Sequence, residues 1–233
     1  MKYKPYQSGM TLIEIMIALL IGAFLLGGVL QIFINTKQTN RMQENISRLQ
    51  ENGRFAMDFL SRDIRMAGYW GCHSGPSPSI DIAGEDNNAA VDTIDNGTDT
   101  ITMKGVFTLT PSTTCSAAAN SANSCGVGIN CYTNASSTIT YKINNSVLQK
   151  DADGVVEGIE NMQILYGVDT DATSSSEANY YVTANLVTAA NWPNVISIRI
   201  TLTARTIDSN LTTTGDGRIR RTFTSTIAVR NRL

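Results

Sequence analysis

The chain has 233 residues, a formal net charge of -2 and only 16% charged side chains. This length suits one sizeable domain with an appendage, and the near balance of charge excludes a strong global field that would attract nucleic acid or an acidic substrate. Apolar residues gather in one block near the N-terminus, while the remainder is rich in Thr, Ser, Asn, Asp and Gly. This asymmetry predicts a polar ectodomain anchored in a membrane.

A short basic leader precedes the apolar block. Residues 1–9 are mostly polar, with Lys2 and Lys4 as their only charged side chains. Residues 12–34 contain no charge except Glu14, and as a helix they would span roughly 35 Å, enough for a bilayer hydrocarbon core. We therefore predict one transmembrane helix, with its N-terminus in the cytoplasm because the lysines precede it.

The unusual features of this segment lie before the apolar core, whereas a secretory signal is cut after it. A glycine, Gly9, ends the leader, and the carboxylate of Glu14 follows shortly afterwards. A charge in an apolar span costs about 2.5–3.5 kcal/mol on insertion scales, so Glu14 needs a partner. If the chain were cut after Gly9, the new amine of Met10 would lie one helical turn from Glu14. The same amine of a neighbouring subunit would then neutralise Glu14 and set the axial register between subunits.

A resemblance to a known family rests on seven consecutive residues, Ser8-Gly9-Met10-Thr11-Leu12-Ile13-Glu14. This string resembles the type III signal of prepilins. The resemblance implies that a prepilin peptidase cleaves between Gly9 and Met10 and that Met10, at a position where phenylalanine is most common, is N-methylated. It also implies that residues 10–34 later join a filament core, with Glu14 acting in assembly. The alternative is a chance match in which Glu14 is a tolerated interfacial charge.

The pattern after residue 34 becomes amphipathic, and no proline occurs between Met10 and Ala67. One face carries apolar residues at steps of three and four, with Gly53 among them: Met42, Ile46, Leu49, Ala56, Leu60, Ile64 and Ala67. The opposite face is charged: Arg41, Glu44, Arg48, Glu51, Arg54, Asp58 and Arg62. We predict one helix, transmembrane at 10–34 and amphipathic at 35–68, that ends at Gly68 as its C-cap.

Short strands and loops are predicted for residues 69–233, which we expect to form a globular head. The segments with alternating or β-branched character are 99–107, 138–143, 146–150, 158–168, 195–204 and 220–229. They predict an antiparallel sheet against the apolar stripe of the helix, and hence the α+β class. The Ser-, Ala- and Asn-rich residues 111–137 are interpreted as a surface loop stapled by disulfides.

Further resemblance narrows the family. Residues 52–72, which end in Arg-Met-Ala-Gly-Tyr-Trp-Gly-Cys, resemble the helix exit of PilW-type minor pilins. Residues 156–169 and 223–233 resemble PilW and also the J-type pseudopilin of type II secretion. The implied function is a minor pilin that primes assembly of a type IV pilus and lies at the filament tip. The alternatives are a J-type pseudopilin, or a pilus-anchored adhesin or DNA receptor that binds through residues 111–137.

The resemblance also implies partners and a location. The partners would be other minor pilins, the major pilin, the prepilin peptidase and the inner-membrane assembly platform. The chain would cross the bacterial inner membrane once, with a periplasmic head, and would then enter the pilus filament.

Four cysteines follow the apolar block, namely Cys72, Cys115, Cys125 and Cys131. An even number outside the cytoplasm favours one or two disulfides, and three full pairings stay open. Buried free thiols are the alternative. A zinc site at Cys72 and His73 is disfavoured, because adjacent ligands without a second chelating pair are a poor tetrahedral template.

Sites for catalysis and for cofactors are weakly supported. The single histidine, His73, leaves little material for a catalytic triad, so we expect a peptidase substrate and not an enzyme. Asp169, Asp171 and Thr173 alternate as in a calcium loop, but the sixth-position glycine and the distal glutamate of such loops are missing. We therefore expect no cofactor, with calcium as the alternative; the shorter run from Asp151 to Gly154 is weaker still.

A basic cluster lies near the C-terminus and comprises Arg218, Arg220, Arg221, Arg230 and Arg232. It invites a DNA-binding interpretation. Arginines at alternating strand positions more often form a solvated face or salt bridges between subunits. We therefore do not expect nucleic acid to be a partner.

Overall fold

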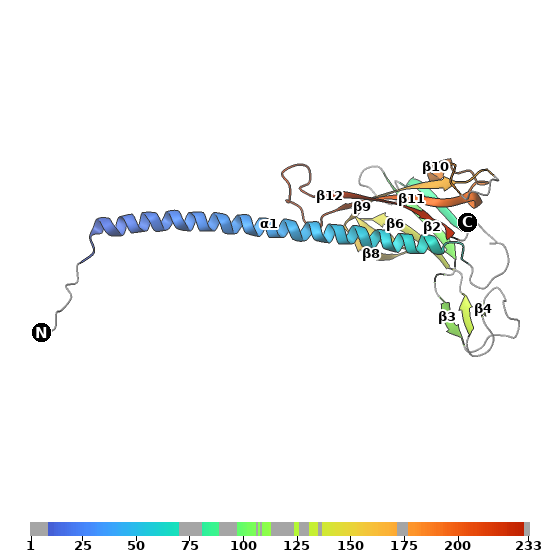
Figure 1. Ribbon diagram of the computed structural model, residues 1–233, viewed down its shortest axis with the longest axis horizontal. Helices are drawn as coiled ribbons and strands as arrows, with labels where there is room; N and C mark the ends of the chain where they lie inside the picture. Colours follow the sequence, from blue (N-terminus) through green and yellow to red (C-terminus); the bar gives the residue numbers. More distant parts are fainter. Residues whose placement is uncertain are drawn as a thin grey trace. The chain divides into compact units, whose positions relative to one another are not determined.

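A computed structural model describes residues 9–69, 81–88, 97–105, 107, 109–112, 124–125, 131–134, 137–171 and 177–230. The chain divides into two compact units, Met1–Asn45 and Ile46–Leu233. After residues 9–11, the described part of the first unit consists of the N-terminal part of helix α1 (Leu12–Met66) (Figure 1). The C-terminal part of α1, from Ile46 on, belongs to the second unit, which is rich in β-strands.

The first part of α1 has its apolar side chains exposed. Phe24 is 84% exposed, Leu12 76% and Leu20 72%. This helix is long and apolar enough to cross a membrane, by length and composition. Such a surface is unfavourable in water and requires lipid or packed helices around it.

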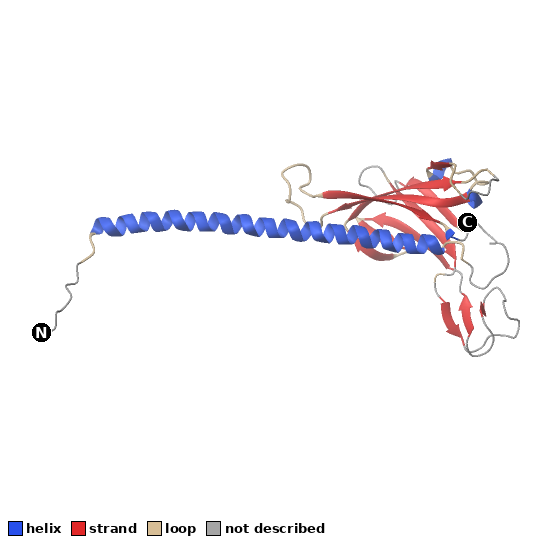
Figure 2. Cartoon of the chain, in the orientation of Figure 1, coloured by secondary structure: helices blue, strands red, loops and turns tan. Residues whose placement is uncertain are grey.

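Two antiparallel sheets make most of the β-rich unit (Figure 2). The five-stranded sheet has the order β1-β2-β6-β7-β8 and contains β1 (Ile82–Asn88), β2 (Thr98–Gly105), β6 (Ser137–Asn144), β7 (Val147–Lys150) and β8 (Asp153–Glu157). The four-stranded sheet has the order β10-β9-β11-β12 and contains β10 (Tyr180–Val182), β9 (Ile159–Val168), β11 (Val195–Arg205) and β12 (Arg220–Ala228).

Smaller elements complete this unit. A three-stranded sheet has the order β3-β5-β4 and contains β3 (Leu109–Ser112), β5 (Cys131–Asn134) and β4 (Ser124–Cys125). Two short 3-10 helices, η1 (Ala184–Leu186) and η2 (Trp192–Asn194), lie between β10 and β11.

The core of the β-rich unit forms between α1 and the two larger sheets. The predicted stripe is buried at Leu49, Ala56, Leu60, Ile64 and Ala67, and these residues belong to one cluster with the inward side chains of the strands. The predicted charged face of α1 is exposed. Burial thus follows the helical period of the sequence, and the α+β class is confirmed.

The end of α1 agrees with the predicted C-cap. The helix ends at Met66, and Gly68 has φ of +72°, a left-handed conformation that glycine adopts without a steric penalty. The Gly68 N–H donates to the Lys104 carbonyl at 2.9 Å, which fastens the helix exit to the end of β2.

All six predicted strands are present with small shifts in their ends. One shift is at Ser146, predicted as the start of a strand, which instead forms a two-residue turn with Asn145, with φ of +60° and +50° respectively. Positive φ at both positions is the signature of a type I′ hairpin turn. The interpretation of residues 111–137 as one loop is wrong, because the end of β3, all of β4 and β5, and the start of β6 lie there.

Candidate functional site: the N-terminal signal and the outer face of the head

The predicted processing and assembly residues lie at the start of α1. Gly9 and Met10 precede the helix and are exposed, with Met10 73% exposed. The backbone N–H groups of Glu14 and Ile15 both donate to the Thr11 carbonyl, at 3.1 and 3.3 Å. Glu14 therefore occupies the first helical turn, where the helix dipole favours a carboxylate. The peptide bond after Gly9 lies outside the helix, and the helix presents Glu14 one turn later.

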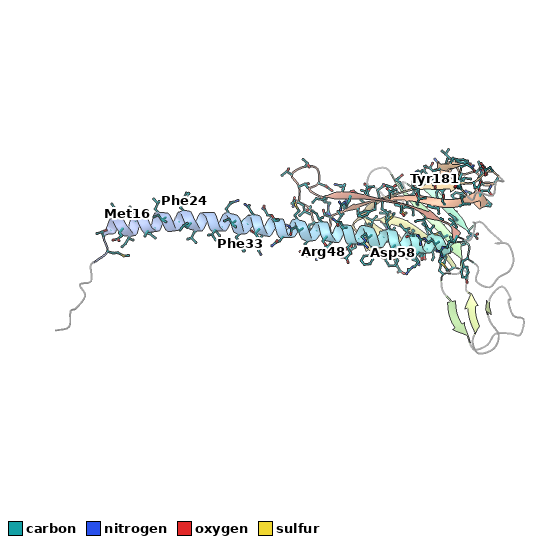
Figure 3. All side chains as sticks on the ribbon, in the orientation of Figure 1. Met16, Phe24, Phe33, Arg48, Asp58 and Tyr181 are labelled. Carbon is teal, nitrogen blue, oxygen red and sulfur yellow. The ribbon has the colours of Figure 1, made fainter. Side chains whose placement is uncertain are left out.

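Exposed apolar side chains surround this carboxylate along the helix. Met16, Phe24 and Phe33 project outward from α1, and no described element covers them (Figure 3). A carboxylate beside such a surface has no counter-charge within the first unit of the described chain. The arrangement therefore suits Glu14 to pairing with a group from another molecule once the apolar surface is covered.

The cysteines fall largely outside the described residues. Cys72 and Cys115 lie in segments that the structure does not describe. Cys125 lies on β4 and Cys131 on β5, where the backbone is described but the side chains are not. Disulfide formation stays a prediction.

The calcium candidate lies in the connection from β9 to β10, and Thr173 is outside the described residues. The Asp171 N–H donates to Asp169 Oδ1 at 3.2 Å, and Asn179 Nδ2 donates to Asp171 Oδ2 at 2.8 Å. These carboxylates therefore already accept hydrogen bonds that shape the loop. Within the described ranges, no three His, Cys, Asp or Glu side chains are grouped to hold a metal. Calcium binding stays a prediction.

The predicted basic cluster is divided by internal contacts. Arg218 Nη1 donates to the backbone carbonyls of Thr206 and Ile207. Arg220 Nε donates to Glu160 Oε2 at 2.6 Å, and its Nη2 donates to Asp216 Oδ2 at 2.8 Å. Arg218 and Arg220 therefore bond to groups of this chain, although the side chain of Arg220 is still 41% exposed. Whether the cluster also pairs with other subunits stays a prediction.

The remaining members of this cluster differ in position. Arg221 and Arg230 are exposed, and Arg232 lies outside the described residues.

The ion pairs around Glu160 change its acid–base behaviour. The hydrogen bond from Arg220 lowers the pKa of Glu160 below its ordinary value, and Arg205 Nη1, at 3.2 Å from Glu160 Oε1, acts in the same direction. The carboxyl of Asp216 also has a lowered pKa, chiefly because it accepts a hydrogen bond from Arg220. This network joins the start of β9 to the end of β11 and the start of β12.

A buried polar group that the sequence interpretation missed lies on the inner face of α1. Asp63 is 5% exposed, and its Oδ2 accepts bonds from Tyr141 Oη at 2.7 Å and from Lys150 Nζ at 2.8 Å. Burial and the bond to Asp63 raise the pKa of Tyr141. The signal in the sequence was a carboxylate three residues after Leu60, on the apolar stripe.

The outer face of the head has a groove between α1 and β12. Its volume is about 820 Å³, and its walls include Ser47, Arg54, Asp58 and Ser61 of α1 with Phe223 and Ser225 of β12. A second hollow of about 390 Å³ shares Asp58 and Ser61 with this groove and is lined by Arg62, Arg65 and Arg230. The two hollows are therefore adjacent.

Two family models match parts of the chain that carry the resemblance. The family described as Type IV Pilus-assembly protein W matches residues 130–231, and the Prokaryotic N-terminal methylation motif matches residues 4–30. A comparison with curated proteins gives no significant match. A solved type IV-like pilin from Thermus thermophilus is similar over 79% of this chain and 97% of that one, with 13% identity and a TM-score of 0.42.

A prepilin-type signal, a long apolar N-terminal helix and a head of antiparallel sheets define the class of the protein as pilin-like. Within that class, residues 130–231 are similar to the family described as Type IV Pilus-assembly protein W.

Proposed function

We propose that this chain is a minor pilin of a type IV pilus that helps to prime filament assembly and lies at the filament tip. The observation that carries the proposal is the helix whose apolar side chains are exposed around a carboxylate in its first turn. A subunit that moves from a bilayer to a filament needs such a surface in both places. The match to the Type IV Pilus-assembly protein W family supports the role in assembly.

In the proposed sequence of events, a prepilin peptidase cuts after Gly9 and Met10 becomes the methylated N-terminus. The first part of α1 then exchanges lipid contacts for helix contacts with other minor pilins and the major pilin, on the inner-membrane assembly platform. Glu14 pairs with the N-terminal amine of a neighbour and sets the register. The head, including its stapling disulfides, lies in the periplasm before it enters the filament.

The test of processing is mass spectrometry of the N-terminus of the full chain, purified from cells with and without prepilin peptidase. We expect a methylated Met10 terminus with the peptidase and an intact leader without it. A Met1 terminus in cells that contain active peptidase would refute the proposed processing.

The test of assembly is a count of pili in cells with Glu14 variants. Glu14→Ala should be processed normally but should fail to assemble. The matched control, Glu14→Ala with Ile17→Glu, keeps the charge on the helix but shifts it by roughly 4.5 Å along the axis. It should also fail if register matters. Normal piliation in Glu14→Ala would contradict the role of the carboxylate.

Two rival functions give different deletion phenotypes. A J-type pseudopilin, which the resemblance of residues 156–169 also favours, would lose protein secretion and keep its pili. An adhesin or DNA receptor would keep normal piliation and lose attachment or DNA uptake. The proposed minor pilin loses pili while secretion stays intact.

A further inference from the structure

The outer edge of β12 has unpaired backbone groups. β12 is the last strand of the order β10-β9-β11-β12, and no described strand pairs with its other edge. The Val229 N–H donates to the Ile196 carbonyl at 2.8 Å, and the Thr206 N–H donates to the Ile219 carbonyl at 2.9 Å. These two bonds show which residues of β12 are hydrogen-bonded to β11, namely every second residue from Ile219 to Val229, because the register between the two strands has no bulge. In an antiparallel ladder the residues between hydrogen-bonded pairs turn their N–H and C=O outward.

The outward-turned residues therefore follow directly from the register, and they are Arg220, Thr222, Thr224, Thr226 and Ala228. Each offers one donor and one acceptor along the edge. Such an edge is a template for the addition of another strand.

The groove beside this edge has the dimensions of a single strand. Its wall on α1 runs from Ser47 to Ser61, a rise of roughly 21 Å along a helix. A six-residue strand is about 20 Å long. The groove also offers apolar surface, because Phe223 and Phe55 line it and Phe55 is 51% exposed. An extended segment would thus find backbone partners on one side and apolar contacts along the helix.

One end of the groove is positively charged. Arg65 and Arg230 line the adjoining hollow, and within the described part of the chain neither makes an ion pair. Arg62, the third arginine there, lies 3.6 Å from Asp63 and stacks on Phe59 with its guanidinium 5.3 Å from the ring centroid. Asp58 is the acidic residue in this hollow, so the arginines outnumber it. The end therefore suits a carboxylate.

We propose that this groove binds an extended segment of a partner protein, which adds as a strand to the edge of β12 and places a carboxylate between Arg65 and Arg230. A helix in the same groove would cover the outward N–H and C=O groups of β12 without bonding to them, which is unfavourable. The edge therefore selects an extended backbone, and the arginines select an acidic side chain at one end. That the partner is another filament subunit rests on the proposed function; the binding site does not.

The experiment uses the full chain in detergent micelles and a fluorescein-labelled hexapeptide of alternating Val and Thr that ends in Glu. Binding is followed by fluorescence polarisation. Thr224→Pro removes one outward N–H, whereas Thr224→Val keeps it, and both lose the same side-chain hydroxyl, which lies 3.2 Å from that of Thr201. We expect Thr224→Pro to weaken binding about tenfold and Thr224→Val to leave it nearly unchanged. Equal affinities for the two variants, or no binding of the peptide to the unaltered chain, would overturn the proposal.

Two further measurements keep the test independent of folding defects in Thr224→Pro. Peptides N-methylated at all odd or at all even residues each lose the donors of one edge. One of these should lose binding and the other should keep it; equal behaviour would contradict strand addition.

Charge recognition is tested by exchange of the terminal residue. Arg65→Glu and Arg230→Glu should weaken binding of the Glu-ended peptide and strengthen binding of a Lys-ended peptide, each about tenfold. Arg221→Glu, which changes the net charge equally on β12 outside this hollow, should have little effect. If all three variants act alike, the carboxylate site is refuted. Because no pilus is involved, this result is separate from failure of the proposed function.

Discussion

Asp63 is a buried carboxylate that holds α1 against the five-stranded sheet, and its removal should lower the free energy of unfolding. In Asp63→Ala, the Tyr141 hydroxyl, on a side chain that is 0% exposed, loses its partner, and Lys150 loses its ion pair. An unsatisfied buried hydroxyl costs about 1–3 kcal/mol. The side chain of Lys150 is 32% exposed and can turn to water, so the loss of its pair costs under about 1 kcal/mol. The expected loss of unfolding free energy is therefore about 1–4 kcal/mol.

The measurement is thermal unfolding of the full chain in detergent, followed by tryptophan fluorescence, because the ring of the partly buried Trp192 packs edge-on to the core residue Tyr166 with centroids 4.9 Å apart. For 150–250 residues, each kcal/mol shifts Tm by about 2–4 °C, so Asp63→Ala should lower Tm by roughly 2–16 °C. Asp63→Asn keeps an acceptor for the Tyr141 hydroxyl and should lose only about 1 kcal/mol.

A double-mutant cycle decides whether this account is right. Tyr141→Phe alone should cost about 1 kcal/mol, since Asp63 loses one bond. Added to Asp63→Ala it should cost nothing or restore stability, because the orphaned hydroxyl is gone. Strictly additive losses would refute the reasoning, as would an Asp63→Ala protein as stable as the unaltered chain.

Three other changes test separate parts of the head. A Cβ on Gly53 would lie 2.2 Å from the Phe223 ring, so Gly53→Ala should destabilise the protein by about 1–2 kcal/mol, although alanine has a higher helix propensity than glycine. In a Phe223→Ala background, where the ring is absent, Gly53→Ala should instead stabilise the protein. If the effects of the two substitutions on thermal unfolding simply add, the contact is contradicted. The pKa of Glu160 is lowered in the folded state, so its ionised carboxylate adds to the free energy of unfolding. This contribution is fully present above the pKa of the unfolded chain, about 4.3, and is lost as pH falls through the lower pKa of the folded chain. Glu160→Gln should therefore narrow the stability difference between pH 7 and pH 3 by about 1 kcal/mol, and an unchanged acid limb would count against the ion pair with Arg220. Added calcium should leave Tm unchanged, because the Asp171 carboxylate already accepts a bond from an amide; a rise reversed by EGTA would show a metal site.

Features encoded by local patterns could be predicted from the sequence. The stripe of α1 was predictable because a helix repeats every 3.6 residues, so spacing alone selects Leu49 and Leu60 for the same face. The hairpin from β6 to β7 was predictable within one residue, because asparagine tolerates the positive φ that such turns need. The signal around Glu14 was predictable because a charge in an apolar run is costly wherever it occurs.

Features that depend on distant pairings could not be predicted. Asp63 is 78 residues from Tyr141 and 87 from Lys150, and nothing near it in the chain indicates these partners. β1 has the sequence Ile-Ala-Gly-Glu-Asp-Asn-Asn, which has low strand propensity, and it becomes a strand because β2 pairs with it. Its Gly84 is also constrained at long range, since a Cβ there would lie 1.9 Å from the Tyr166 hydroxyl.

Gly53 shows how a local pattern and a distant contact combine at the proposed binding groove. The spacing of the stripe places Gly53 on the buried face of α1, but spacing does not say why a residue without a side chain stands there. The structure gives the reason, since the ring of Phe223 occupies the space that a Cβ would fill. This contact brings β12 close to the helix, so that Thr224, one of the outward-turned residues of the strand, lines the same groove as Ser47 and Ser61. A larger residue at this position would therefore move the edge of β12 as well as strain the core. If the strand-addition proposal is right, Gly53→Ala should weaken peptide binding along with stability, whereas Tyr141→Phe, a change in the buried core away from the groove, should affect stability alone.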